Sequence, residues 1–180
     1  MNKNITILIL MPALIFLYGC PYSSPYPIDK QPVLPIDTTL IGKWATFIEK
    51  PSNSSFYKEE PVKVILSKFT DSVYSVSITG YINELKPFKV IDNDSIKGIA
   101  YLSAVQNRQL LNTFIGGKVY IAEVKKKNNT VSILPLSERI TSKLIKSCME
   151  LRIALDFHYK ISRVPLYDEQ FSLTNLQKVN

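Results

Sequence analysis

The sequence predicts a mainly β fold: an antiparallel barrel or strongly curled sheet of about seven or eight strands, with one C-terminal amphipathic helix. Segments rich in β-branched and aromatic residues recur between residues 37 and 180, and turn residues separate them. Only one stretch, near residue 150, carries apolar residues at helical spacing. With 46% hydrophobic and 21% charged residues, the composition is that of a globular protein. We therefore expect 37–180 to be a single β domain.

The first 19 residues are expected to be a signal peptide. Lys3 precedes an apolar run, Ile5 to Leu17, which spans only about 20 Å as a helix. That is shorter than the roughly 30 Å hydrocarbon core of a bilayer. The run therefore indicates a cleaved targeting segment and not a permanent membrane span.

Leu17-Tyr18-Gly19-Cys20 resembles the lipobox of bacterial lipoproteins. The resemblance implies that Leu17 and Gly19 are recognised during processing and that Cys20 receives the lipid. Two or three acyl chains would then anchor the protein stably to a membrane. An ordinary secretory signal is the alternative, and in that case a disulfide between Cys20 and Cys148 is formally open. Pro21 follows where sorting rules of enteric bacteria place aspartate for inner-membrane retention, so we expect the outer membrane, facing the periplasm.

Residues 20–36 are predicted to be the lipidated cysteine and a tether. Five prolines and no glycine lie between residues 21 and 36. Proline fixes φ and favours extended neighbours, so this segment could reach about 50 Å from the membrane. A proline-rich ligand motif is the less favoured interpretation.

The domain is expected to open at Leu40-Ile41-Gly42-Lys43-Trp44. Its Gly-x-Trp resembles the first strand of lipocalin-like barrels, in which the tryptophan packs across the closed end, although a plain core tryptophan has the same pattern. Further strands are expected where β-rich runs end at turn signals such as Gly116-Gly117 and Asn128-Asn129. The predicted strands after Trp44 cover 62–69, 73–79, 96–105, 110–115, 118–126 and 130–134, with 87–91 as a short candidate and 171–179 as a possible last strand.

One amphipathic helix is predicted from the spacing of Ile140, Leu144, Cys148, Leu151 and Leu155. Thr141 or Ser142 would cap its start. We expect this stripe to cover an open side of the sheet. A helix lying on a membrane surface is the alternative, because Lys143, Lys146 and Arg152 lie off the stripe.

No catalytic constellation is evident, so the sequence favours a protein that is not an enzyme. His158 is the only histidine, and no nucleophile-elbow, phosphate-loop or metal-ligand spacing occurs. We expect no cofactor and no metal. The net charge of +7 is dispersed. Its one tight run, Lys125 to Lys127, is typical of a solvated turn, so we expect no nucleic-acid partner.

Aromatic strand positions could line a small apolar pocket inside a barrel. The candidates are Trp44, Tyr74, Tyr101 and Tyr120. The N-terminal motifs and the Gly-x-Trp together resemble small, uncharacterised lipoproteins of Gram-negative bacteria, which implies a lipocalin-like β domain and no known activity. Two functions stay open. The first is an envelope lipoprotein that binds a small apolar ligand or acts as an accessory factor. The second is a protein–protein module, an inhibitor or assembly factor, with a filled core.

Overall fold

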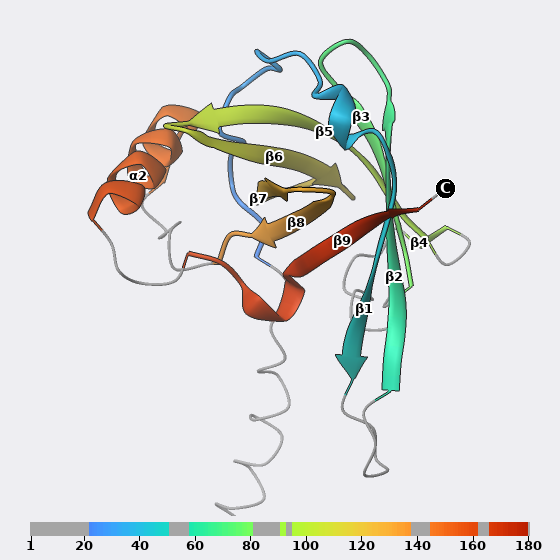
Figure 1. Cartoon of the computed structure of the whole chain (residues 1–180). Helices are drawn as coiled ribbons and strands as arrows, with labels where there is room; N and C mark the ends of the chain where they lie inside the picture. Colours follow the sequence, from blue (N-terminus) through green and yellow to red (C-terminus); the bar gives the residue numbers. More distant parts are fainter. Residues whose placement is uncertain are drawn as a thin grey trace, which may run out of the picture.

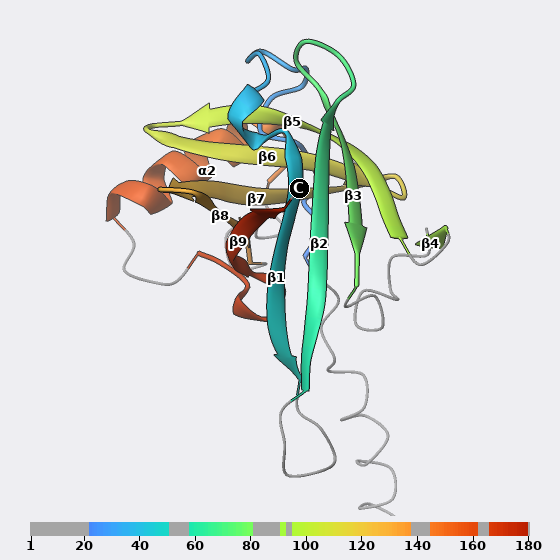
Figure 2. The same ribbon diagram turned by 45° about the vertical axis from the view of Figure 1, so that its right-hand side comes forward.

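The computed structural model describes residues 22–50, 58–80, 91–92, 95–137, 145–161 and 166–179. Within these residues the chain forms an antiparallel barrel of eight strands with one α-helix on its outside, as the sequence predicted (Figures 1 and 2). Every pair of neighbouring strands is antiparallel. Leu17, Gly19 and Cys20, which are the predicted lipobox residues, lie outside the described residues.

The barrel strands follow one another around the wall. They are β1 (Gly42–Lys50), β2 (Lys58–Lys68), β3 (Tyr74–Thr79), β5 (Ser95–Val105), β6 (Arg108–Ile115), β7 (Lys118–Lys127), β8 (Thr130–Pro135) and β9 (Leu173–Val179). The remaining described elements are the short β4 (Ile91–Asp92), the 3-10 helices η2 (Thr38–Leu40) and η4 (Glu169–Phe171), and the helix α2 (Cys148–Ile161).

Two pairings close the barrel. β5 pairs with β3 over its first half and with β6 over its second half. β9 comes from the C-terminus and pairs with both β8 and β1, so the last strand lies beside the first. Closure removes exposed sheet edges, which would otherwise invite pairing with other chains.

The tight turns form where the sequence places residues that tolerate positive φ. Asn128 has φ +53° in the β7–β8 turn, and Gly116 and Gly117 have φ +57° and +76° in the β6–β7 turn. Asparagine and glycine adopt these angles at low cost. These two hairpins agree with the prediction within two residues at each strand end.

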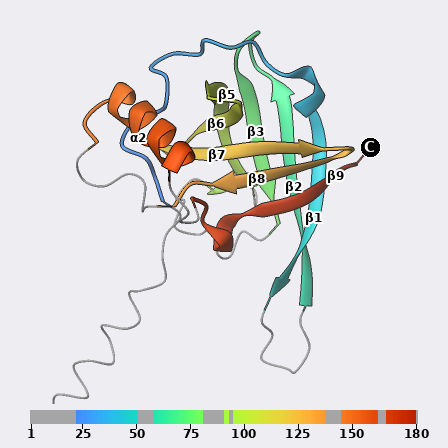
Figure 3. The ribbon, with the colours of Figure 1, turned by 60° about the vertical axis from the view of Figure 1, so that its left-hand side comes forward.

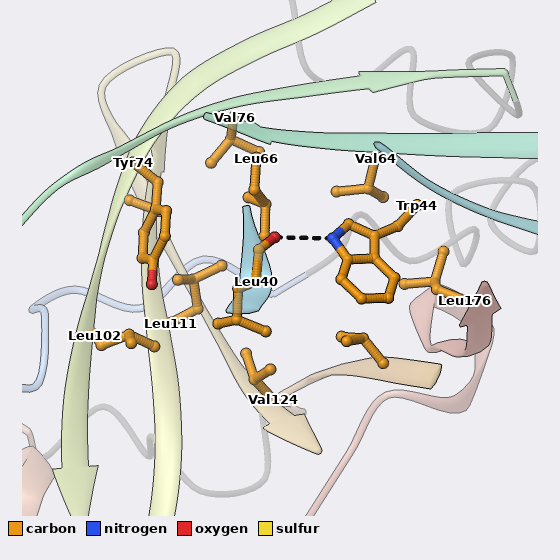
Figure 4. Packing of buried hydrophobic residues seen from close by; sticks show 12 residues of the cluster. Leu40, Trp44, Val64, Leu66, Tyr74, Val76, Leu102, Leu111, Val124 and Leu176 are labelled. Atoms are coloured by element: carbon orange, nitrogen blue, oxygen red, sulfur yellow. Dashed lines mark hydrogen bonds between the residues drawn. The ribbon is translucent and has the colours of Figure 1, made fainter. Parts of the chain in front are cut away.

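The interior of the barrel is filled by one apolar cluster (Figure 4). Leu40 of η2 enters it from one end, and its carbonyl oxygen accepts a 2.8 Å hydrogen bond from the indole nitrogen of Trp44. The buried members of the cluster are Leu40, Trp44, Val64, Leu66, Tyr74, Val76, Ala100, Leu102, Leu111, Val124, Val131 and Leu176.

A second apolar cluster lies on the outside of the wall, between strands β5 to β7 and two covering segments. One cover is α2, which contributes Leu151 and Leu155. The other is the N-terminal segment 22–36, which runs along the barrel beside α2 (Figures 1 and 3). Its Ile28 is 1% exposed, and its backbone nitrogen donates a 2.8 Å hydrogen bond to Asn112 Oδ1.

This packing corrects the prediction of a semi-rigid tether outside the folded domain for the part of 20–36 that the structure describes. Residues 22–36 lie on the barrel, because the apolar residues between the prolines pack against both clusters. Leu34 and Ile36 pack against the interior cluster, and Tyr26 and Ile28 belong to the outer one. The folded unit therefore includes residues well before the predicted boundary at residue 37.

The helix also begins later than predicted. Residues 145–147 are not helical, and α2 starts at Cys148, where Ser147 Oγ accepts a hydrogen bond from the backbone nitrogen of Glu150. The predicted first turn, with Ile140, Thr141, Ser142 and Leu144, lies outside the described residues. Among the helices that the structure describes, none is long and apolar enough to cross a membrane.

Candidate functional site

Two of the predicted pocket residues lie inside the barrel as core side chains. Trp44 is 5% exposed and Tyr74 is fully buried, and both pack in the interior cluster (Figure 4). The Tyr74 hydroxyl donates to the carbonyl oxygen of Asp37 and accepts from its backbone nitrogen. Burial raises the pKa of Tyr74 to about 12. These residues therefore tie η2 to the barrel interior.

The other two predicted pocket residues have different surroundings. Tyr120 is on the same face of β7 as the interior residue Val124, and it is half-buried beside Ile96 and Ile115 in a smaller apolar group. Tyr101 does not face the interior as expected, since it alternates with the interior residues Ala100 and Leu102 along β5. Its hydroxyl donates to the carbonyl oxygen of Asp29 on the N-terminal segment. Burial, followed by the charge of Asp29, raises the pKa of Tyr101 to about 12.

His158 and Cys148 both lie on α2. His158 lies on α2, where its ring packs edge-on against Tyr159, with ring centroids 6.5 Å apart. Cys148 is a half-buried free thiol at the start of α2. Within the described ranges, no three histidine, cysteine or acidic side chains gather in a way that could hold a metal ion.

A buried carboxylate marks the most strongly built polar site of the described structure. Glu123 on β7 is 3% exposed and faces outward from the barrel. Arg108 Nη1 lies 3.1 Å from both of its carboxylate oxygens. The Tyr167 hydroxyl donates to Oε2, and the Tyr159 hydroxyl lies 3.5 Å from the same atom. Three separate parts of the chain therefore converge on this one carboxylate.

Two cations pack over the tyrosine rings of this site. The Arg108 guanidinium lies 4.4 Å from the Tyr159 ring centroid, and Lys125 Nζ lies 4.9 Å from that of Tyr167. Burial and then the negative charge of Glu123 raise the pKa of Tyr159. The pKa of Tyr167 is raised by burial and then by its hydrogen bond to Glu123. Both tyrosines are therefore neutral donors at physiological pH.

The pKa of Arg108 is raised as well. Desolvation acts to lower it, but the charge and hydrogen bonds of Glu123 outweigh that effect. The guanidinium consequently stays charged while it stacks on Tyr159. Glu123 is surrounded by Arg108, Tyr159 and Tyr167, and Lys125 Nζ also lies 3.8 Å from its Oε1. It is therefore placed as a structural counter-ion and not as a free general base.

An open depression of about 570 Å³ borders this site. Four of its lining side chains are cationic, against the single acid Glu123. The lining comprises Asn107, Arg108, Gln109, Glu123, Val124, Lys125, Lys126, Lys127, Thr130, Ser132 and Asn175. Such a surface attracts anionic groups.

One of these lysines also holds the structure together. Lys126 forms an ion pair with Asp37 and donates a 3.0 Å hydrogen bond to Thr39 Oγ1, which links β7 to η2. Burial acts to raise the pKa of Asp37, but hydrogen bonds from Lys126 and Thr39 lower it overall. Lys125 has a looser contact, 3.8 Å from Glu123 Oε1, and Lys127 lies at the end of β7. These two lysines are therefore the better candidates for contact with a bound anion.

Sequence reasoning missed Glu123 and treated Lys125 to Lys127 only as a solvated turn. The available signal was a single acid inside the apolar run from Val119 to Val124, on the face that also carries Ile121. Such a residue on a buried face needs a cationic partner. The partners could not be identified, because Tyr159 and Tyr167 reach β7 only through the tertiary fold.

The chain matches no family model, no curated protein and no solved structure.

Proposed function

We propose that the chain is a lipid-anchored envelope protein whose barrel is a non-enzymatic binding module. The anchor is Cys20, which residues 1–19 deliver as a lipoprotein signal peptide. The lipobox resemblance of Leu17-Tyr18-Gly19-Cys20 supports this assignment. Pro21 after the cysteine favours the outer membrane, with the barrel facing the periplasm.

The observation that carries the binding role is the cationic depression beside Glu123. Its lysines lie on the β7–β8 hairpin, next to a carboxylate that is already paired with Arg108. We infer that this surface binds an acidic segment of another envelope protein. Buried side chains fill the described interior around Trp44 and Tyr74. That packing favours the interaction module over a small apolar ligand held in this part of the barrel.

The anchor is tested by mass spectrometry and fractionation of the protein expressed in a Gram-negative host. The wild-type chain should sediment with membranes and carry a diacylglyceryl group on an N-terminal Cys20. Cys20→Ser should appear unmodified in the soluble fraction, whereas the matched Cys148→Ser should behave as wild type. An unmodified wild-type chain in the soluble periplasm would contradict the anchor.

The binding surface is tested by photo-crosslinking in intact cells. A photo-reactive residue at Asn107, inside the depression, should capture one reproducible acidic protein. The variant Lys125→Gln/Lys127→Gln should lose that adduct. Its control, Lys43→Gln/Lys63→Gln, removes the same charge from exposed positions on β1 and β2 and should keep it.

Two outcomes would contradict the proposed surface. One is an adduct that survives the loss of Lys125 and Lys127. The other is a small apolar molecule that remains bound to the purified protein in native mass spectrometry, which would favour ligand binding inside the barrel instead.

A further inference from the structure

Helix α2 carries a second apolar stripe that the barrel does not cover. Met149, Ile153, Phe157 and Ile161 are 71%, 60%, 61% and 64% exposed. They are spaced four residues apart, so they lie along one face of the helix, over about 18 Å. Scattered exposed apolar residues are ordinary, but a continuous row of four marks an interaction surface.

The opposite face of α2 already accounts for its attachment to the barrel. Leu151 and Leu155 are fully buried in the outer cluster. Arg152 forms a 2.6 Å ion pair with Asp29 and a 2.6 Å hydrogen bond to the carbonyl oxygen of Ala104. The helix is therefore held rigidly, and its exposed stripe is not needed for the described core.

Helix α2, which carries the stripe, lies beside the N-terminal segment. Tyr26 and Ile28 pack in the same cluster as Leu151 and Leu155, and the segment runs beside α2 in both views (Figures 1 and 3). Tyr26 is the sixth residue after Cys20, so the two lie at most about 22 Å apart. A lipid on Cys20 would therefore hold the bilayer close to this face.

The charges around the stripe fit the surface of a bilayer. Lys146 precedes the helix and is exposed, and the exposed Lys160 in the last turn balances the charge of Asp156. Lysines can extend their ammonium groups to the headgroups while their methylenes stay on apolar surface. Glu150 and Asp156 have local partners, since Glu150 accepts from the Lys146 backbone nitrogen and Asp156 pairs with Lys160 at 2.6 Å.

We propose that the exposed stripe of α2 inserts into the surface of the bilayer that carries the Cys20 anchor. The inference rests on the proposed lipid anchor and deepens it. The acyl chains keep the protein on the membrane, while α2 fixes which side of the barrel faces it. An apolar helix face of this kind buries a few ångströms into the headgroup region. Because the N-terminal segment packs on the barrel beside α2, only a short stretch of chain separates the lipid on Cys20 from the helix.

The test uses fluorescence quenching by brominated phospholipids. The lipidated protein is reconstituted into vesicles of phosphatidylethanolamine and phosphatidylglycerol, with and without bromine on the acyl chains. Phe157→Trp reports on the stripe. Phe69→Trp is the matched control, since Phe69 is 64% exposed on the β2–β3 turn. The single native tryptophan, Trp44, is buried, and its signal is subtracted with the wild-type protein.

We expect brominated lipid to lower the added fluorescence of Phe157→Trp by about twofold, as for a side chain at the acyl boundary. Phe69→Trp should be unaffected. Equal, weak quenching of both variants would overturn the proposal. So would a concentration-dependent dimer that Ile153→Gln abolishes, because the stripe would then pair with a second copy.

A parallel sample separates this result from the fate of the anchor. The mature chain with Cys148→Ser, in its non-lipidated form, is coupled through Cys20 to a maleimide phospholipid. If cells do not acylate Cys20, the mass spectrum will show an unmodified cysteine, and the proposed lipid anchor is then wrong. The quenching of Phe157→Trp in the coupled protein still decides whether α2 enters the bilayer.

Discussion

Glu123 is stabilised by neighbours that are distant in the sequence. A buried carboxylate requires a cation and hydrogen-bond donors, because it has lost its hydration. Arg108 supplies the charge, while Tyr167 and Tyr159 supply hydroxyls. The side chain of Arg108 is itself 39% exposed, so the pair lies at the edge of the buried region and opens onto the depression. Arg108 therefore both neutralises the buried Glu123 and contributes positive charge to the depression.

We predict that Glu123→Gln lowers the free energy of unfolding by about 1–3 kcal/mol, since charge-assisted hydrogen bonds from Arg108 and Tyr167 are lost. Urea denaturation followed by circular dichroism measures the change. The matched control is Asp71→Asn, which removes an acid from the solvent-exposed Lys68–Asp71 pair and should leave the stability unchanged. Equal effects of both substitutions would show that Glu123 is not held as described.

Four buried or half-buried tyrosines predict a loss of stability at alkaline pH. The pKa values of Tyr74 and Tyr101 are raised to about 12, and those of Tyr159 and Tyr167 are also raised. The unfolded chain releases these protons near its ordinary tyrosine pKa of about 10, while the folded chain still holds them. The contribution is therefore complete below pH ~10 and falls as pH rises towards ~12.

The measurement compares urea midpoints at about pH 8, 10 and 11.5 for the wild type and for Tyr101→Phe. The wild-type midpoint should decline across the upper two values. Tyr101→Phe should decline less steeply, because one of the linked protons is absent. A wild-type midpoint that stays constant across this range would disprove the linkage.

The N-terminal segment acts as an element of the fold although it has almost no regular secondary structure. It forms one isolated bridge, between Ser24 and Val119, and it satisfies polar groups of the wall at Asn112 and Tyr101. Its prolines hold it extended, which suits a segment that lies across strands. The fold therefore depends on the stretch of chain that directly follows the proposed lipid anchor.

We predict that Ile28→Ala destabilises the protein by about 2–5 kcal/mol, the range for truncating a fully buried aliphatic side chain. Val33→Ala is the matched control, because Val33 belongs to the same segment but is 65% exposed. It should change the stability little. Thermal unfolding of both variants tests this difference, and similar melting temperatures would mean that the segment does not pack on the barrel.

Closure of the whole barrel depends on β5, which pairs with β3 at one end and with β6 at the other. β5 leaves β3 and joins β6 around residues 99 and 100. Gly98 lies just before this point, where a Cβ atom would come within 2.4 Å of the Phe114 carbonyl oxygen. Real Cβ atoms do not approach a carbonyl oxygen so closely, so only glycine lets the end of β6 pass this point of β5.

We predict that Gly98→Ala lowers the free energy of unfolding by about 1–3 kcal/mol through overpacking at the closure. Hydrogen exchange of the β5 and β6 amides should accelerate more than that of the β7–β8 hairpin. Ile99→Ala, a truncation at a 42% exposed neighbour, serves as the control and should have a smaller effect on both measurements. Unchanged exchange in Gly98→Ala would contradict a tight approach of the two strands.

Much of the fold could be predicted because its signals are local. Alternation along 73–79 marked β3, and the residues at Gly116-Gly117 and Asn128-Asn129 marked two hairpins. Which side chains of β5 point into the barrel could not be predicted from such local signals. Ala100, Tyr101 and Leu102 are all buried, since the interior covers one side of the strand and the N-terminal segment covers the other. Alternation identifies two faces but does not say which one is inside.

The sequence by itself determined the strand and turn pattern, the single C-terminal helix and the mainly β class, because each depends on the preferences of neighbouring residues. Tertiary structure decided the rest. It placed 22–36 on the barrel, turned Tyr101 outward, joined Glu123 to Arg108, Tyr159 and Tyr167, and left one apolar face of α2 exposed. These outcomes depend on which distant segments come into contact when the barrel closes, and local sequence patterns do not predict such contacts.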